Sequence, residues 1–447
     1  MERILIGELG AHIGKKVTIK GWVDARRDHG KLIFMVVRDR SGIVQAVVHA
    51  SAQEPFAALA DAKGEWVIAL SGTVQERPEK MRTADQNGNL ELSIESAQIL
   101  SSAHPLPFEH DAELNIDTYF DHLPLTLRRK RARDIFTMAA TVVQEDRHAR
   151  VRRGFTEFQA PALVGGDAEG GAAVFKVGYY HDQTAYLATS PQLYKQIMVG
   201  AFERAFTIAK IFRAEKSATT RHLAELTQMD FEMGFVEDHR DVLEVLEDVV
   251  RDVVTTASQK HADMFAAFGS TAPLLPKGTF PTLTLTEAQD ILEDECGVKA
   301  RGEPDMEPEH ERKICEWAKE KHGSDFVFIT AYPTSKRALY TYEDPVEAPF
   351  SRGFDLLFRG LEINSGAQRI HNYDDLVAKI RARGMDPEKF AFYLEAFKYG
   401  MPPHGGCSTG LERFVARMLE LPNVKEATPF PRDMTRIDTR LSHHEEQ

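Results

Sequence analysis

Residues 212–236 read FRAEKSATTRHLAELTQMDFEMGFV, and this stretch places charged side chains inside apolar, strand-like sequence. Arg213 and Glu215 stand two residues apart, as do Asp230 and Glu232, so each pair is expected on one face of a strand. Charged side chains among Phe and Met residues are costly to bury unless they are paired or bind a ligand. The stretch therefore predicts a charged site built on strands.

Two later segments have the same texture. FDLLFRGLEINSGAQRIH, residues 354–371, carries Asp355, Glu362, Ser365 and Arg369, and GGCSTGLERF, residues 405–414, carries Arg413. One such segment alone is compatible with a structural ion pair. Several together, with an excess of Arg, favour a polyanion and a divalent cation, and ATP with Mg²⁺ is the simplest combination.

Other common chemistries lack their sequence signals. The chain has no GxxxxGK[ST] phosphate loop, no GxGxxG after a strand, no HExxH and no GxSxG. Cys407 stands in a Gly-rich turn without an obvious base partner, so a packing role is favoured over a nucleophile. Three cysteines are too few and too scattered for a disulfide framework.

The chain divides into regions of different texture. Residues 1–103 contain five short, β-branched-rich segments separated by turn signals, which predicts a small β-barrel of the OB type. Residues 104–126 are expected to be a linker. Residues 127–447 mix strands and helices without a regular βαβ rhythm, beginning with a long amphipathic helix over 128–154, and an acidic, Pro-rich insertion is expected around 262–325. The fold class is therefore α+β and multidomain.

Composition is that of a globular protein without a membrane span. The 447 residues are 43% hydrophobic and 28% charged, with a net charge of −13, and no apolar run approaches the ~18 residues of a membrane helix. No signal peptide is recognisable, so a cytoplasmic location is expected. Residues 15–40 and 128–153 are locally basic, which is compatible with phosphate binding on an acidic body or with solvated helix faces.

The motifs together resemble those of a known family, the class II aminoacyl-tRNA synthetases. GFTEFQAPAL (154–163) is similar to the first class II motif with Pro161, the stretch quoted first is similar to the second, and STGLER, ending in Arg413, is similar to the third. The supporting stretches EGG (169–171), SPQLYKQ (190–196), LEINSGAQRIH and YGMPPHGG point to the compact archaeal-type aspartyl-tRNA synthetases. This resemblance implies an OB-fold anticodon-binding domain and a catalytic domain with an antiparallel sheet flanked by helices.

The resemblance also implies the residues of the nucleotide site. Arg213 would hold the α-phosphate and the amino-acid carboxylate, and Arg413 would stack on adenine; these two are the expected catalytic residues. The expected ATP-binding set is Arg213, Glu215, Arg221, His222, Leu223, Glu362, Gly410 and Arg413. Glu362, Ser365 and Asp355 would bind Mg²⁺ through hard oxygen ligands.

For the amino acid, the resemblance implies aspartate. Lys195 and Arg369 would bind its side-chain carboxylate, and Gln192, Glu169 and Asp230 would contact its ammonium and orient Lys195. Arg213 and Ser365 complete the expected aspartate-binding set. A neutral asparagine would leave the Lys195 and Arg369 charges uncompensated, which costs several kcal/mol.

Alternatives remain open. Asparaginyl-tRNA synthetase has the same scaffold, although Glu is usual there in place of Asp230, and lysyl-tRNA synthetase lacks the Lys–Arg pair. A non-catalytic RNA-binding paralogue would usually lose one of Arg213, Glu362 or Arg413, and all three are present. The sequence departs from the family at KRALYTY (336–342), where Pro-Phe-Tyr usually follows the Arg, and at TQMD (227–230).

Partners also follow from the resemblance. The expected partners are tRNA(Asp) and L-aspartate, in a homodimer formed through the first motif. Phe34 would stack on an anticodon base, Gln45 would read a base edge and Arg27 would contact the anticodon loop, whereas the alternative for Phe34 is a barrel-core position. His29 in RRDHG tends to accompany enzymes that also charge tRNA(Asn), whose product a separate amidotransferase converts; the alternative is a solvated turn residue.

Overall fold

The structure is a computed structural model that describes residues 2–84, 86–109, 112–166, 173–216 and 219–437. Two compact units divide the chain, residues 1–115 and 116–447, and each is described by itself. Among the described residues, no helix is long and apolar enough to cross a membrane.

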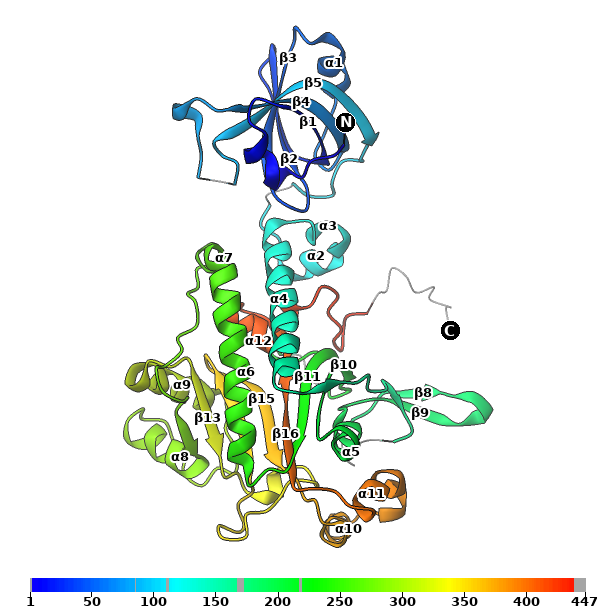
Figure 1. The fold of residues 1–447 in the computed structure, drawn as a ribbon, viewed down its shortest axis with the longest axis vertical. Helices are drawn as coiled ribbons and strands as arrows, with labels where there is room; N and C mark the ends of the chain where they lie inside the picture. The colour runs from blue at the N-terminus through cyan, green and yellow to red at the C-terminus, as the bar shows by residue number, and fades with distance from the viewer. Residues whose placement is uncertain (1, 85, 110–111, 167–172, 217–218, 438–447) are drawn as a thin grey trace. The chain divides into compact units, whose positions relative to one another are not determined.

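The first unit is a closed barrel of five strands in the order β1-β2-β3-β5-β4 (Figure 1). Its strands are β1 (Lys16–Asp28), β2 (Leu32–Arg38), β3 (Ile43–His49), β4 (Val67–Glu76) and β5 (Leu90–Ser101), with α1 (Gln53–Leu59) between β3 and β4. Two short 3₁₀ helices are η1 (Ile6–His12) and η2 (Glu79–Met81). The predicted OB-type barrel is confirmed.

Alternation along the strands decides which side chains fill the barrel. In β2, Ile33, Met35 and Val37 are buried in the core, while Phe34 and Val36 point outward and are half-buried. The alternative interpretation of Phe34 as a core residue is therefore wrong. The strands also approach closely, because a Cβ added at Gly72 would lie 2.0 Å from the Ser93 carbonyl oxygen.

The second unit is built on an eight-stranded sheet with the order β12-β13-β14-β15-β16-β11-β10-β6. Its strands are β6 (Thr156–Glu157), β10 (Arg204–Phe212), β11 (Glu225–Gly234), β12 (Thr282–Thr284), β13 (Phe326–Thr330), β14 (Gly353–Phe358), β15 (Leu361–Gln368) and β16 (His404–Gly410). A separate small sheet contains β7 (Leu163–Val164), β9 (Thr184–Leu187) and β8 (Lys176–Gly178). All pairings in the large sheet are antiparallel except β6 with β10 and β12 with β13, so the predicted α+β class is confirmed.

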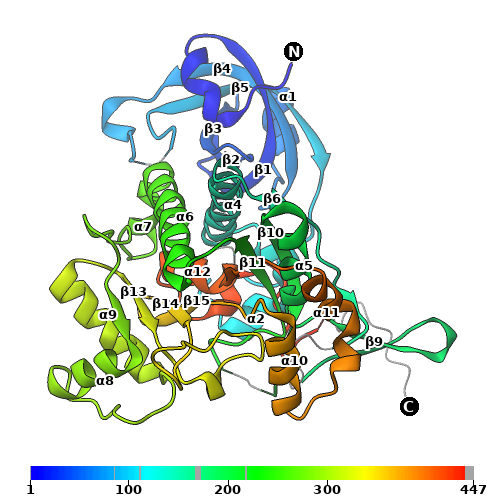
Figure 2. The ribbon, with the colours of Figure 1, turned by 60° about the horizontal axis from the view of Figure 1, so that its bottom comes forward.

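Helices cover the sheet. The longer ones are α4 (Lys130–Arg152), α5 (Gln192–Phe202), α6 (His239–Lys260), α8 (Leu285–Asp294), α9 (Pro308–His322), α10 (Tyr373–Ala382), α11 (Ala391–Lys398) and α12 (Leu411–Met418). The shorter ones are α2 (Ile116–Asp121), α3 (Leu123–Thr126), α7 (Ala262–Ala267), η3 (Tyr180–Asp182), η4 (Thr334–Lys336), η5 (Pro387–Phe390) and η6 (Val424–Ala427). Figures 1 and 2 show α4 and α6 side by side, and their apolar faces share one core with β11, β16 and α12.

Three further sequence predictions concern a long helix, the segment 262–325 and the end of one strand. The long helix predicted over 128–154 is α4, and the expected insertion at 262–325 contributes β12 to the edge of the sheet as well as α7, α8 and α9. The prediction that Arg213 and Glu215 share a strand face is wrong, because β10 ends at Phe212. The Arg213 N–H still donates to the Ala224 carbonyl, one position beyond the last pair of β10 and β11, so the regular strand ends where the predicted site begins.

Candidate active site

The middle of the large sheet carries buried acids that face away from the main core. In β11, Met229 and Phe231 pack into that core, so Asp230 and Glu232 point to the opposite face. Both acids are fully buried. Gly406 of the neighbouring strand makes room for them, since a Cβ there would lie 2.3 Å from the Glu232 Oε2 atom.

Two buried cations neutralise these acids. Lys195 of α5 donates to Asp230 Oδ2 at 3.0 Å and to the Cys407 carbonyl at 3.0 Å, and it lies 3.4 Å from Glu232 Oε2. Arg369, just after β15, donates to Glu232 Oε1 at 2.8 Å and to the Gly406 carbonyl at 2.8 Å. Burial alone would raise the pKa of Glu232, but Arg369 and Lys195 hold this pKa below its usual value.

This pairing corrects part of the charge argument made from the sequence. Lys195 and Arg369 were expected to be uncompensated without an anionic ligand, whereas Asp230 and Glu232 already balance them. Selection of a carboxylate therefore rests on the directions of the remaining N–H groups rather than on bare charge. Glu232, to which the sequence analysis assigned no role, belongs to this charged cluster, and its spacing from Asp230 was the available signal.

Asp230 retains one unused acceptor. Its Oδ1 atom is buried and makes no hydrogen bond within the described structure. An unpaired carboxylate oxygen is costly to bury, and a cationic ligand would compensate it. Gln192 lies beside the same cluster, with its amide nitrogen 3.5 Å from Glu232 Oε2. Glu169, expected here as well, lies outside the described residues.

Cys407 is a packing residue, as predicted. Its side chain lies in the core on the helix side of the sheet, where burial raises its pKa to about 12. Such a thiol is protonated at neutral pH and is a poor nucleophile.

A cavity of about 160 Å³ opens next to this buried charged cluster, on the same strands. Its lining contains all the residues predicted for ATP except Glu215, namely Arg213, Arg221, His222, Leu223, Glu362, Gly410 and Arg413. It also contains Ser365, which was predicted for aspartate and Mg²⁺, and Gln228, Glu412 and Val424. Glu215 and Asp355 do not line it. The two sites adjoin because Ser408, which lines the cavity, is the cross-strand partner of Asp230.

The basic side chains of this cavity are held by different means. Arg413 donates to the Glu362 carbonyl at 3.0 Å. Arg221 donates to the Gly360 carbonyl at 2.8 Å and pairs with Glu311 at 3.0 Å. Burial, together with the nearby Arg413 and Arg213, lowers the pKa of His222, so its imidazole is neutral at pH 7 and offers hydrogen bonds rather than charge.

Glu311 was missed by the sequence analysis. It lies in the first turn of α9, within the segment expected to be an insertion, and nothing in that segment's local pattern distinguishes it from its acidic neighbours. Burial raises the pKa of this carboxyl, and the nearby Arg221 opposes the change. This segment thus supplies a carboxylate that pairs with Arg221, a residue of the cavity lining.

The predicted Mg²⁺ ligands are only partly available. Arg337 donates to both oxygens of Asp355, at 3.0 and 2.7 Å, and to Ser365 Oγ at 3.2 Å. Glu362 is different: burial and repulsion from Asp355 raise its pKa to about 7, and Arg413, 3.6 Å from its Oε2 atom, opposes the change. No group of three His, Cys, Asp or Glu side chains with the arrangement of a metal site occurs among the described residues.

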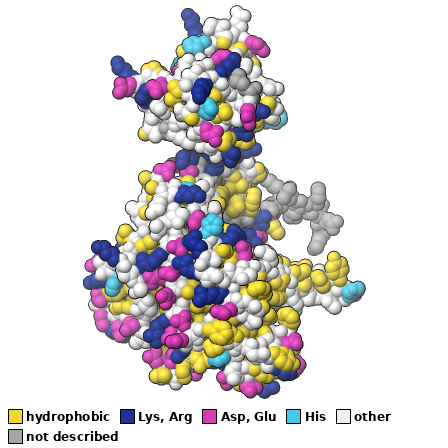
Figure 3. All heavy atoms as spheres, in the orientation of Figure 1, with side chains coloured by type: hydrophobic (Ala, Val, Ile, Leu, Met, Phe, Trp, Pro, Cys, Tyr) yellow, Lys and Arg dark blue, Asp and Glu magenta, His cyan; other side chains and the backbone are white. Residues whose placement is uncertain are grey.

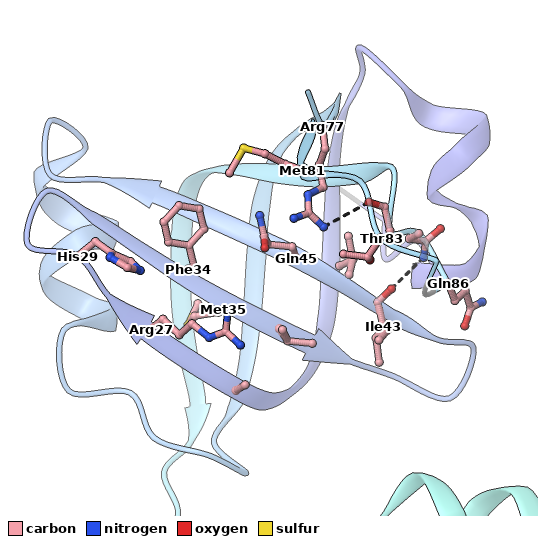
Figure 4. A pocket seen from close by; sticks show the side chains of 15 residues that line it. Arg27, His29, Phe34, Met35, Ile43, Gln45, Arg77, Met81, Thr83 and Gln86 are labelled. Carbon is pink, nitrogen blue, oxygen red and sulfur yellow. Dashed lines mark hydrogen bonds between the residues drawn. The ribbon is translucent and has the colours of Figure 1, made fainter. Parts of the chain in front are cut away.

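On the barrel, a cavity of about 360 Å³ gathers all four residues predicted for the anticodon, Arg27, His29, Phe34 and Gln45 (Figure 4). The His29 and Phe34 rings meet edge to face with centroids 5.5 Å apart. Gln45 donates to Glu91 Oε2 at 3.1 Å, which fixes its amide. The connection between β4 and β5 adds Arg77, Met81, Thr83 and Gln86, which the sequence analysis had treated only as a turn.

Comparisons with known proteins cover both units. A family model described as tRNA synthetases class II (D, K and N) matches residues 115–434, and one described as an OB-fold nucleic acid binding domain matches residues 17–100. The aspartate–tRNA(Asp/Asn) ligase of Thermus thermophilus is 43% identical over 97% of this chain and 99% of its own. The ligase of the same name from Deinococcus radiodurans is 38% identical, covering 98% and 99%.

A solved structure is similar to this chain over nearly its whole length. Asparaginyl-tRNA synthetase from Pyrococcus horikoshii, complexed with asparaginyl-adenylate, superposes with a TM-score of 0.87 at 30% identity, covering 98% of this chain and 99% of that one. The scaffold is therefore shared by relatives whose names specify different amino acids.

Proposed function

The chain belongs to the class II tRNA synthetases of the aspartate, lysine and asparagine group, and from this premise we propose that it attaches L-aspartate to tRNA through aspartyl-adenylate, using ATP. The observation that carries the proposal is the contact between two sites on one sheet. A buried cluster of charged side chains that includes Lys195 and Arg369 adjoins a cavity lined by Arg213 and Arg413. Such an arrangement suits an amino acid with an acidic side chain placed beside a nucleotide.

The first step joins the amino acid to the nucleotide. The α-carboxylate of aspartate attacks the α-phosphorus of ATP, pyrophosphate leaves, and aspartyl-adenylate results. The carboxylate is itself the nucleophile, so no general base is needed, and the protein contributes positioning and charge stabilisation. Arg213 can bridge the carboxylate and the α-phosphate with its planar fork, and Arg413 can stack on adenine.

Mg²⁺ supplies neutralisation of phosphate charge when it is bound. Glu362 would hold it, with Ser365 nearby, whereas Asp355 contributes through Arg337, which contacts both Asp355 and Ser365. In the second step a hydroxyl of the tRNA 3′ adenosine attacks the activated carbonyl and AMP leaves.

For the amino acid, Lys195 and Arg369 would bind the side-chain carboxylate, while Asp230 Oδ1 and Gln192 would accept hydrogen bonds from the ammonium. Asparagine is the second candidate, because a close structural relative is named for it. The names of the sequence relatives favour aspartate.

For the tRNA, the barrel cavity would bind the anticodon, with Phe34 stacking on a base and Gln45 reading a base edge. We expect both tRNA(Asp) and tRNA(Asn) to be charged, on the basis of His29 and of relatives named for both. Asp-tRNA(Asn) would then need an amidotransferase, and the protein would act in the cytoplasm, where translation takes place.

A homodimer completes the proposal. β6, from the first class II motif, is a two-residue edge strand that pairs with β10, and it leaves that side of the sheet open to a second copy. Apolar side chains gather near the β8–β9 hairpin in Figure 3, and Val151 and Leu163 are about half exposed. Sedimentation at micromolar concentration should give twice the monomer mass, and a monomer would contradict this part.

The experiment for the whole proposal is aminoacylation with labelled aspartate. Purified protein, ATP and Mg²⁺ are incubated with transcripts of tRNA(Asp) and tRNA(Asn), with tRNA(Lys) as a control. Acid-precipitable aspartate on the first two transcripts is expected. Charging of neither transcript, with folded protein, would overturn the proposal.

A further inference from the structure

A row of hydrogen-bonded, buried polar side chains adjoins the charged cluster around Glu232. It consists of His404 at the start of β16, Gln196 and Gln192 in α5, and Tyr393 in α11. His404 and Gln196 are completely buried, and Gln192 and Tyr393 are nearly so. The proposed reaction uses only Gln192, so the other three need a separate explanation.

The carbonyl of Pro402 fixes the state of His404. The His404 Nδ1 atom lies 2.8 Å from this oxygen, and a carbonyl oxygen only accepts hydrogen bonds, so Nδ1 carries the proton. Burial lowers the pKa of His404 to about 4, which keeps the ring neutral near pH 7. Nε2 is then a pure acceptor.

The acceptor role of His404 Nε2 determines the orientation of the neighbouring amides. Gln196 Nε2 lies 2.8 Å from His404 Nε2 and must donate to it. Gln196 Oε1 therefore faces the other way, where it accepts from Gln192 Nε2 and from the Tyr393 hydroxyl, both at 3.0 Å. The amide nitrogen of Gln192 therefore donates to Gln196, and it also lies 3.5 Å from Glu232 Oε2.

We propose that His404 and Gln196 are positioning residues that fix the Gln192 amide so that its oxygen is presented to the ammonium of the substrate. This inference rests on the proposed function. A flipped Gln192 would present its NH₂ group to an ammonium, placing donor against donor, and would also leave Gln196 Oε1 without one of its donors. The order donor-to-acceptor runs unbroken from Gln192 through Gln196 to His404.

The test separates ammonium recognition from general damage by using succinate, which is aspartate with hydrogen in place of the ammonium. In the Gln196→Met variant, the KM for aspartate in ATP–pyrophosphate exchange should rise roughly 10- to 100-fold, as for loss of a hydrogen bond to a charged group. The KM for ATP and the inhibition constant of succinate should stay within about twofold of the wild-type values.

The matched control is Gln289→Met, which removes another buried glutamine amide, in α8, where Nε2 donates to the Glu303 carbonyl. This control should leave the aspartate KM unchanged. An aspartate KM that is unchanged in Gln196→Met, or a succinate constant that rises in parallel with it, would overturn the proposal.

If Gln196→Met does not fold, a pair of variants at the other end of the chain decides. His404→Gln retains an acceptor for Gln196 and should keep the aspartate KM within about threefold of wild type, whereas His404→Leu should raise it at least about tenfold. Equal aspartate KM values in the two variants would overturn the proposal. Failure of the proposed function is a different result, namely no aspartate-dependent exchange by the wild-type protein.

Discussion

The sheet site and the barrel cavity differ in how strongly their side chains are buried and held in place. In the sheet site, Lys195, Arg369, Asp230 and Glu232 are buried and held by one another before any substrate arrives. On the barrel, Arg27 and His29 are exposed, and Phe34 and Gln45 are half-buried. A small substrate gains from groups that are already oriented, whereas splayed RNA bases gain from an accessible surface on which they stack. Substitutions in the sheet site should therefore impair both adenylate formation and transfer to tRNA. Substitutions on the barrel should impair only the transfer to tRNA.

The largest effect is expected at the arginines of the nucleotide cavity. Arg213→Ala and Arg413→Ala should each reduce ATP–pyrophosphate exchange by at least about a hundredfold, because each removes charge or stacking at the reacting nucleotide. Arg240→Ala is the control, since the Arg240 side chain is 80% exposed and lies outside both cavities. Near-normal exchange in either variant would contradict the role assigned to that arginine in binding the nucleotide.

The next largest effect is expected at Lys195. Lys195→Met leaves Asp230 buried without its partner, so the protein should lose about 3–5 kcal/mol of unfolding free energy and most of its exchange activity. Adding Asp230→Asn removes the orphaned charge, and the double variant should recover thermal stability but not exchange. Recovery of exchange in the double variant would show that the ion pair has only a structural role.

Phe34→Ala sharpens the comparison from the barrel side. Stacking on a base is worth about 1–3 kcal/mol, so aminoacylation should fall roughly 5- to 150-fold while tRNA-independent exchange is unchanged. Ile33→Ala, which opens the barrel core, is the matched stability control. Equal loss in both assays for Phe34→Ala would indicate misfolding rather than lost RNA contact.

A pH experiment tests Glu362, whose carboxylate lies 3.6 Å from the Arg413 guanidinium rather than in close contact with it. Because the folded pKa of Glu362 is about 7, this carboxyl is largely protonated at pH 6 and must lose its proton to bind a cation. Between pH 8 and 6, the Mg²⁺ concentration for half-maximal exchange should rise about tenfold. The Phe34→Ala variant should show the same dependence, and a requirement independent of pH would contradict the role of Glu362.

The same shift has a signature in stability. A carboxyl whose pKa is raised by folding binds more protons in the folded state, so the free energy of unfolding falls as pH rises from about 4.5 to about 7. Glu362→Gln should remove this contribution and flatten the thermal denaturation profile over that window. An unchanged profile would place the titration elsewhere.

The smallest effect is expected at His29. His29→Leu should sharpen the preference for tRNA(Asp) over tRNA(Asn) by roughly 3- to 10-fold, about 1 kcal/mol, because one polar contact in the barrel cavity is removed. Ratios of kcat/KM for the two transcripts measure it. A wild-type preference above about a hundredfold would refute relaxed tRNA use, whatever the variant does.

The sequence predicted the elements whose pattern is local. The five barrel strands, α4 and the charged segments of β11, β15 and β16 follow from alternation and helical spacing. Arg337 and Glu311 did not follow, because their partners Asp355 and Arg221 lie 18 and 90 residues away along the chain. The end of β10 at Phe212 was missed because nothing in FRAE marks a strand boundary.

The site residues divide in the same way. Arg213, Arg413 and Glu362 were placed by motif resemblance, and the structure brings them to one cavity. The contact of Asp230 with Lys195 was implied by the resemblance, whereas the pairing of Arg369 with Glu232 was not, because the two residues lie 137 positions apart along the chain. The tautomer of His404 depends on a hydrogen bond to the Pro402 carbonyl. Every residue has a backbone carbonyl, so the sequence does not show which one lies beside the imidazole.

The most direct test of the central claim is exchange driven by aspartate against exchange driven by asparagine. The two amino acids differ in one carboxylate oxygen replaced by NH₂, which would place a donor against the N–H groups of Lys195 and Arg369. We predict a kcat/KM for aspartate at least about a hundredfold above that for asparagine, which corresponds to about 2.7 kcal/mol. Asparagine-driven exchange that equals or exceeds aspartate-driven exchange would contradict the account.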